Sequence, residues 1–232
     1  MIFAIAPAIA PIIGGCIFSF GDWHAIFWFL CAFGLLLWLA CIAFLPETHP
    51  SIRRTSISMR SLWRNYVGMV TDQTFRRLSL SAGFNFGVLF LYIASAPAFV
   101  LEHLKLGTMD FGWFFVPTIA GMMLGAFTSG RLAGRLSPER CVALAYAIML
   151  MAGVINVAYA VSGLSFSLPW AVLPIAAAAF GIAIAFPAIT LMLLDRYPAH
   201  RGAASSLQSF VSLVLNAVVA GVLAPWLNVA PQ

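Results

Sequence analysis

Residues 4–15 read AIAPAIAPIIGG, an uncharged run that holds two prolines and two glycines among apolar residues. Proline inside a helix in water costs about 3 kcal/mol. A bilayer tolerates such helix breakers because neighbouring helices satisfy the backbone groups that they free. The run therefore predicts a bent and tightly packed transmembrane helix. Because it opens the chain without a preceding loop, we expect further spans to precede it in the natural protein.

The composition indicates the same class of protein. Of the 232 residues, 62% are hydrophobic and 8% are charged, whereas a soluble domain has about 25% charged residues. The sequence therefore predicts an all-α, polytopic membrane bundle. A span needs about 20 mostly apolar residues. Seven segments qualify, at about 1–20, 25–45, 78–99, 111–130, 141–161, 168–194 and 203–226.

A polar linker at residues 46–77 divides the predicted spans into two groups. Residues 1–45 would be the last two helices of one bundle, and residues 78–232 would be five of the six helices of another. Within the linker, apolar residues recur at helical spacing beside two arginines: Leu62, Tyr66 and Met69 or Val70, with Arg60 and Arg64. This pattern favours a short amphipathic helix at the membrane interface, with a solvated basic loop as the alternative. Asp72 or Thr74 would cap the span that follows.

The basic residues predict the orientation of the spans. Eleven of the 12 lysines and arginines fall in alternate loops, which therefore lie on one side of the membrane. The positive-inside rule makes that side cytoplasmic, with the N-terminus cytoplasmic and the C-terminus external. Rhodopsin-like proteins have the opposite orientation, and the last span here lacks their lysine. The net charge of +5 thus reflects topology, and we expect no nucleic-acid partner.

Small residues mark faces where helices touch in lipid. The first span places small residues on one face, and the fourth carries Gly121 and Gly125 in GxxxG spacing. Such faces form in any tightly packed bundle, and they also suit a moving seam between two bundles. We expect the seam to be formed by Ala10, Pro11, Gly14, Gly15, Gly121 and Gly125.

Several motifs, taken in their order along the chain, resemble those of a known family. Residues 10–15, Ala-Pro-x-x-Gly-Gly, resemble the antiporter signature in helix five of major facilitator superfamily drug exporters, with Ala10 in place of the usual glycine. Residues 21–29 resemble the turn into helix six, and residues 45–48 resemble its exit. GRLAGRL at 130–136 resembles the second cytoplasmic loop motif, without its acidic residue.

Together with FPA at 186–188 and GAASS at 202–206, these motifs make the chain most similar to the Bcr/CflA, bicyclomycin-resistance branch of drug:proton antiporters. The resemblance runs across nearly all residues. It implies that the seven spans correspond to helices five to eleven, so that helices one to four and helix twelve would lie outside this chain. The proton-coupling residues of the family would lie in those absent helices.

The same resemblance implies which spans face the substrate cavity, namely the third and the sixth. The acidic side chains near the spans lie at loops or helix ends, so the cavity would be aromatic and neutral. Its predicted residues are Phe84, Asn85, Tyr92 and Phe186. Alternatively, Asn85 is an interhelical hydrogen-bond strut. Gln208 and Asn216 are polar residues inside the last span, and we interpret both as buried struts between helices.

Arg131, Arg135 and Asp195 are candidates for a cytoplasmic gate, in which the arginines bridge helix ends to Asp195 or Glu139. The alternative is ordinary positive-inside charge. The four cysteines show no paired spacing, so we interpret them as small buried hydrophobic residues.

The sequence predicts a fragment of a transporter that expels drugs or small amphipathic molecules by alternating access, coupled to protons, in a bacterial-type inner membrane. Its partners would be a drug-like molecule, protons and the lipid bilayer, and we expect a monomer without cofactor or metal. A non-transporting truncated membrane protein or assembly subunit is the alternative. An intramembrane enzyme is disfavoured because HExxH, GxSxG and an in-span Asp or His pair are absent.

Overall fold

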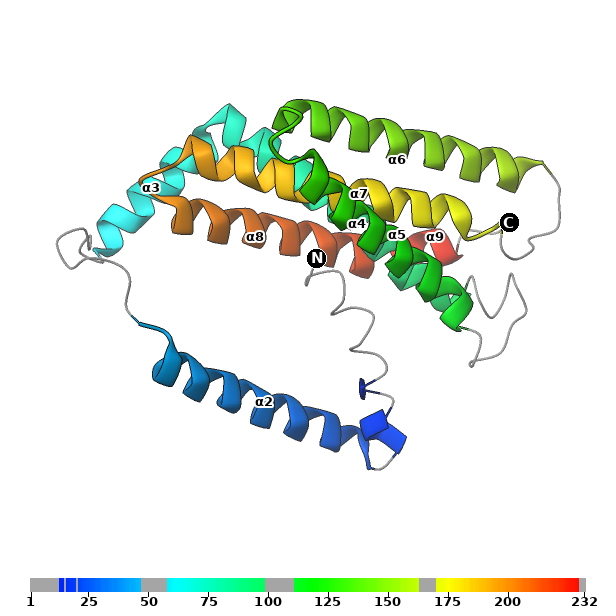
Figure 1. The fold of residues 1–232 in the computed structure, drawn as a ribbon, viewed down its shortest axis with the longest axis horizontal. Coiled ribbons are helices and arrows are strands. Elements are labelled where there is room, and N and C mark those ends of the chain that lie inside the picture. The colour runs from blue at the N-terminus through cyan, green and yellow to red at the C-terminus, as the bar shows by residue number, and fades with distance from the viewer. Residues whose placement is uncertain are drawn as a thin grey trace. The chain divides into compact units, whose positions relative to one another are not determined.

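The computed structural model describes residues 13–14, 16–19, 21–46, 58–98, 111–162 and 170–229. This part of the chain is helical (Figure 1). Its only extended pairing is an isolated bridge between Ala133 and Leu136. The predicted all-α membrane bundle is confirmed. The named helices are α2 (Trp23–Phe44), α3 (Met59–Thr71), α4 (Gln73–Ala98), α5 (Phe111–Leu132), α6 (Pro138–Val161), α7 (Leu173–Arg196), α8 (Arg201–Val218), the π-helical turn η4 (Val219–Leu223) and α9 (Ala224–Val229).

Among the described residues, five helical runs are long and apolar enough to cross a membrane. They are α2, α4, α6, α7 and the continuous run from α8 into α9. The predicted span at 111–130 forms α5, which has 22 residues but is not one of these five. Most of the predicted first span lies outside the described residues, which include only 13–14 and 16–19 of it.

The described residues fall into two compact units that divide between Leu62 and Trp63, inside the predicted linker. In the first unit, α2 buries none of its residues. Cys31 and Cys41 on α2 are therefore exposed, and Cys16 before it is exposed as well, which corrects the expected burial of these three, whereas Cys141 in the second unit is buried.

Helix α7 is the centre of the second unit. Helices α5 and α6 pack against it, and α4 contacts both α7 and α8. Figure 1 shows α6 running along α7 and α5 crossing it obliquely. Helix α7 accordingly buries residues on several sides, namely Pro174, Ala179, Gly181, Ile182, Ile184, Ala185, Ile189 and Leu193.

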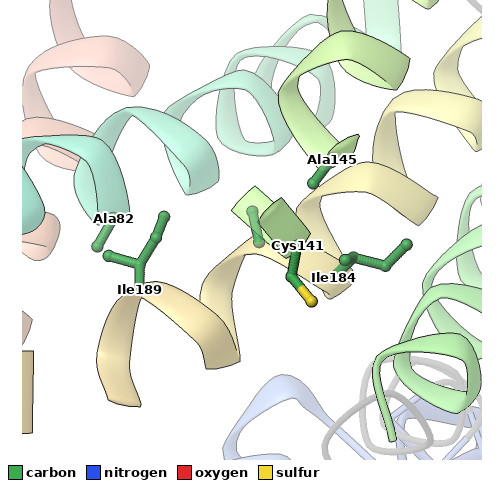
Figure 2. Packing of buried hydrophobic residues seen from close by; sticks show 6 residues of the cluster. Ala82, Cys141, Ala145, Ile184 and Ile189 are labelled. Carbon is green, nitrogen blue, oxygen red and sulfur yellow. The ribbon is translucent and has the colours of Figure 1, made fainter. Parts of the chain in front are cut away.

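The core between α4, α6 and α7 combines small and branched side chains. Ile184 and Ile189 project from α7, and Ala82 of α4 and Cys141 and Ala145 of α6 pack around them (Figure 2). All five are at most 7% exposed. Small residues on the outer helices leave room for the branched residues of α7, which gives the dense packing typical of protein interiors.

Gly121 and Gly125 bring α5 directly onto the backbone of α7. A Cβ at Gly121 would overlap the carbonyl oxygen of Ala176, and one at Gly125 would overlap that of Phe180. The pair was predicted to meet the first span at a seam between bundles. The structure corrects this partner, because α7 already occupies the face that the two glycines open.

Most of the other residues of the predicted seam lie outside the part of the chain that the structure describes. Ala10, Pro11 and Gly15 lie outside the described residues. Gly14 is described, and open space surrounds the position of an added Cβ there. Their role at a seam stays a prediction.

The corner between α3 and α4 confirms the predicted linker helix and its cap. Helix α3 ends at Thr71, and α4 begins at Gln73. Between them, the Asp72 carboxylate accepts a hydrogen bond of 2.9 Å from the backbone N–H of Thr74, as an N-cap does. The predicted central loop at 46–77 therefore contains a helix and the first turn of α4.

Prolines lie inside several of the long helical runs. Pro117 lies inside α5 and Pro187 inside α7. Pro225 follows η4, where the helix widens from α to π geometry. Proline has no N–H and its ring crowds the carbonyl four residues earlier, so a wider turn before Pro225 relieves that contact.

Replacing Gly121 with alanine should force α5 away from α7. The added Cβ meets the Ala176 backbone, which cannot rotate aside, so we expect the free energy of unfolding to fall by about 1–3 kcal/mol. Gly153→Ala in α6 is the matched control, because its Cβ would meet open space. Thermal unfolding in detergent should show a loss for Gly121→Ala and none for Gly153→Ala. Equal behaviour of the two variants would contradict the close approach.

Candidate functional site

A single buried amide joins α4 to α7. The side-chain nitrogen of Asn85 donates a hydrogen bond of 3.1 Å to the backbone oxygen of Ile182. Asn85 is 1% exposed, so it contacts protein and not a cavity. This favours its interpretation as an interhelical strut. Ile182 lies five residues before Pro187, so the strut holds α7 close to its internal proline.

The first cavity lies beside this strut, among α4, α5 and α7, and has a volume of about 600 Å³. Phe86 of α4 and Phe186 of α7 meet in it edge to face, with ring centroids 4.7 Å apart. Its polar side chains are Ser129 and Thr190. The remaining residues that line it are Met122, Ala126, Gly130, Ala133, Ile182, Ala183, Pro187, Leu191 and Leu194.

The second cavity lies among α4, α6 and α7 and has a volume of about 1090 Å³. Phe84 and Tyr92 of α4 line it, together with several side chains of α6. Many of its walls are strongly exposed, including Phe84 at 58% and Leu150 at 72%. The second cavity is an apolar groove with exposed walls, although its lining also includes hydroxyl groups, such as those of Tyr92 and Ser95, and buried residues such as Ala179. The first cavity is smaller and contains the Phe86–Phe186 pair.

The structure separates the residues that were predicted to share one cavity. Phe186 lines the first cavity, Phe84 and Tyr92 line the second, and Asn85 lines neither. The single predicted cavity is corrected in this respect. The reason is the rotation of α4, which turns Asn85 into the interface with α7 and directs Phe84 to the groove beside α6.

Sequence reasoning missed Thr190 as a cavity residue. It lies four residues after Phe186, and therefore on the same face of α7. This spacing could have identified it. Its hydroxyl accepts a hydrogen bond of 3.1 Å from the side-chain nitrogen of Gln208 on α8. Gln208 is 4% exposed and Asn216 is 6% exposed, so both are buried as predicted, and Gln208 fixes one wall of the first cavity.

The gate candidates make other contacts than those predicted. The Arg131 guanidinium lies 4.2 Å from the ring centroid of Phe127. Asp195 forms an ion pair of 3.2 Å with Arg201, and both side chains are 59% exposed. In this conformation Asp195 thus pairs with the start of the next helix, and the gate formed by Arg131 and Arg135 stays a prediction. Exposed pairs of this kind are worth at most about 1 kcal/mol.

The turn that carries Arg135 depends on a glycine. Gly134 has φ of 80°, a left-handed conformation that costs other residues about 1–2 kcal/mol. The sequence resembles a loop motif that often has an acidic residue at this position. Here the backbone conformation favours glycine, which gives a structural reason for the departure.

Asp72 holds the α3–α4 corner against the end of α7. The Tyr197 hydroxyl donates to its carboxylate over 2.5 Å, and the Arg196 Nε lies 3.6 Å from the same oxygen. The hydrogen bond from Tyr197 holds the pKa of Asp72 below its usual value, and the Arg196 charge adds to this effect. Burial, together with the bond to Asp72, raises the pKa of Tyr197 to about 12.

Known proteins are similar to this chain over most of its length. The family model described as Major Facilitator Superfamily matches residues 1–220. A bicyclomycin resistance protein homolog of Haemophilus influenzae is 28% identical over 97% of this chain and 56% of its own length. Multidrug transporter MdfA of Yersinia pestis is 24% identical, and that of Edwardsiella piscicida 26%, each over 91% of this chain and 51% of its own length. The chain thus spans about half the length of these relatives.

Removing the Asn85 amide should loosen α4 from α7. Asn85→Ala loses one buried interhelical hydrogen bond, which is worth about 1 kcal/mol in membrane bundles, and leaves the Ile182 carbonyl with one partner fewer. We expect a lower free energy of unfolding in a mixed detergent titration. Asn156→Ala, at an exposed position on α6, is the control and should lose less. A larger loss at Asn156 would contradict the strut.

The Asp72–Tyr197 contact should respond to both extremes of pH. Because the pKa of Asp72 is lowered in the folded state, its contribution is present above about pH 4 and disappears as the pH falls further. Because the pKa of Tyr197 is raised, its contribution is present below about pH 10 and disappears toward pH 12.

Melting temperatures of the reconstituted chain at stepped pH test both limits of this range. Asp72→Asn should flatten the acid limb of the profile, and Tyr197→Phe should flatten the alkaline limb. Profiles that match the unsubstituted chain at both limits would show that the contact does not stabilise the corner.

Proposed function

Because the chain belongs to the major facilitator superfamily, a family of transporters, we propose that it forms one wall of the substrate path in an exporter of drug-like small molecules. Export would proceed by alternating access and be driven by inward proton movement. Residues 1–45 would belong to one helical bundle and residues 78–232 to the other, joined by the central segment at 46–77.

The observation that carries this proposal is the first cavity. Its volume of about 600 Å³ lies within the range of about 300–1,000 Å³ typical of small-molecule sites. Such sites combine apolar and aromatic walls with a few polar groups that orient the ligand. The Phe86–Phe186 pair and the hydroxyls of Ser129 and Thr190 match that description.

The chemistry of this cavity favours amphipathic ligands that are neutral or cationic. Aromatic faces attract cations, and the cavity wall contains no carboxylate or basic side chain. Phe186 precedes Pro187, which lies inside α7 and lines the same cavity, and proline is a common site of helix kinks. We infer that Phe186 contacts the substrate and that movement of α7 about Pro187 opens and closes the path.

The names of the relatives support the substrate class. One is a bicyclomycin resistance protein homolog, and others are multidrug transporters. Proton coupling rests on the resemblance to drug:proton antiporters. The middle of each predicted span lacks Asp, Glu, Lys and Arg, so these spans would supply substrate contacts and not the groups that carry the proton.

The proposed setting is the inner membrane of a bacterium. The basic loops would face the cytoplasm, which places the N-terminus inside and the C-terminus outside. The protein would act as a monomer. Arg131 and Arg135 would then lie at the cytoplasmic end of the path, where they are positioned to act as a gate in another conformation.

Truncating Phe186 should weaken ligand binding. Phe186→Ala removes an aromatic wall from the first cavity, and we expect binding of the fluorescent cation ethidium to the reconstituted chain to weaken about tenfold, since an aromatic contact of this kind contributes about 1.4 kcal/mol. Phe210→Ala is the control, because that side chain on α8 is 61% exposed and lines neither cavity. Equal affinities for all three proteins would argue against this cavity as the site.

The same vesicles distinguish transport from the alternative, a non-transporting membrane subunit. With an imposed proton gradient, a transporter should move ethidium across the bilayer, and Phe186→Ala should slow this movement. Binding that Phe186→Ala weakens, without any gradient-driven movement, would support the subunit.

A further inference from the structure

Helix α3 has two apolar faces, and only one of them packs against the rest of the second unit, to which α3 belongs from Trp63 onward. Met69 is 3% exposed and belongs to a cluster with Phe75, Leu193 and Ala204 of α4, α7 and α8. The hydroxyls of Tyr66 and Ser206 lie 3.5 Å apart. This inner face is the apolar pattern that the sequence predicts. It is covered by protein, so it is not the face that meets a membrane.

The second apolar face is open. Met59 is 80% exposed, Trp63 71%, Val67 43% and Val70 47%. These residues are spaced at i, i+4, i+8 and i+11, so they form one row along the helix. Four exposed apolar side chains in a row, one of them tryptophan, require a partner other than water.

A basic row borders the open apolar row. Arg60 and Arg64 each follow an apolar member of the row by one residue, and both are exposed. The 13 residues of α3 include no Asp or Glu. Arg76 and Arg77 at the start of α4 are also exposed. A surface that complements this side of α3 therefore offers apolar groups to the open apolar row and negative charge to the basic row. Anionic lipid offers both, in its acyl chains and its phosphate groups.

The chain connection places α3 at the boundary of the bilayer. Only Asp72 separates α3 from α4, whose residues Gln73–Ser95 are apolar enough to cross the membrane. Asp72 also binds Tyr197 and Arg196 at the end of α7. Figure 1 shows α3 leading into α4 beside the start of α8. At about 20 Å in length, α3 is too short to span a bilayer and suits its surface.

We propose that the open face of α3 lies in the bilayer interface and binds anionic phospholipid. Trp63, Val67 and Val70 enter the boundary of the acyl chains, and Arg60 and Arg64 contact the phosphate groups above them. This lipid contact is separate from the substrate cavity and does not depend on the proposed transport function.

Two adjacent positions test this geometry in the full chain. Cys16, Cys31, Cys41 and Cys141 are replaced by alanine, and a single cysteine is placed at Val67 or Gly68 and labelled with the fluorophore NBD. Val67 lies in the open apolar row, whereas Gly68 points about 100° away, is exposed and leaves open space for a side chain. Vesicles contain phosphatidylcholine and phosphatidylglycerol, with one of the two lipids brominated to quench NBD nearby.

We expect brominated lipid to quench the label at position 67 and not at position 68. Brominated phosphatidylglycerol should quench more than brominated phosphatidylcholine at equal content. Arg64→Gln should reduce that preference about fivefold, as expected for one basic residue at an anionic surface. Arg140→Gln, an equal charge change at the start of α6, should leave it unchanged.

Three results would overturn the proposal. Equal quenching at positions 67 and 68 would show that α3 has no membrane-facing side. Absence of quenching at both positions would mean that water or another protein surface covers the open face. Quenching without a preference for phosphatidylglycerol, or with a preference that Arg140→Gln reduces as much as Arg64→Gln does, would exclude anionic lipid recognition by α3.

Discussion

The close approach of α5 to α7 is the contact on which the second unit depends. Lipid supplies no hydrophobic force between helices, so their association relies on packing and on satisfied polar groups. Gly121 and Gly125 allow the α5 surface to reach the α7 backbone, and Asn85 bonds that backbone from α4. Contacts from α5 and α4 hold α7 on the N-terminal side of Pro187, and the first cavity, which Pro187 lines, forms among these three helices.

Much of this fold follows from the sequence. Six of the seven predicted spans coincide with described helices of suitable length, and the Asp72 cap and the buried Gln208 are confirmed. These features are local, or follow from the cost of exposing polar groups to lipid. The partner of a small-residue face is not local. Gly121 and Gly125 indicate that some helix approaches closely, and only the three-dimensional packing identifies it as α7.

For the candidate site, too, the sequence predicts the helices involved but not which of their residues share a cavity. Aromatic and polar residues on α4 and α7 correctly indicate that these helices line cavities, yet their grouping depends on how α4 is rotated against α7. That rotation directs Asn85 into the interface and Phe84 into a groove on the other side. Helix α3 is a similar case, because it has two apolar rows and only packing decides which one the protein covers.

Polar groups in the middle of the helices make a different kind of contact from those at the helix ends. In the middle, Asn85 and Gln208 are neutral amides that join helices without a charge to desolvate. At the ends, Asp72 pairs with Arg196 and Asp195 with Arg201, where water screens the charges. Contacts near the surface are weak enough to exchange partners, whereas buried amide contacts keep α4, α7 and α8 together. A rocking transporter needs this combination, since each bundle must move as a rigid body while the contacts at its ends are broken and formed again.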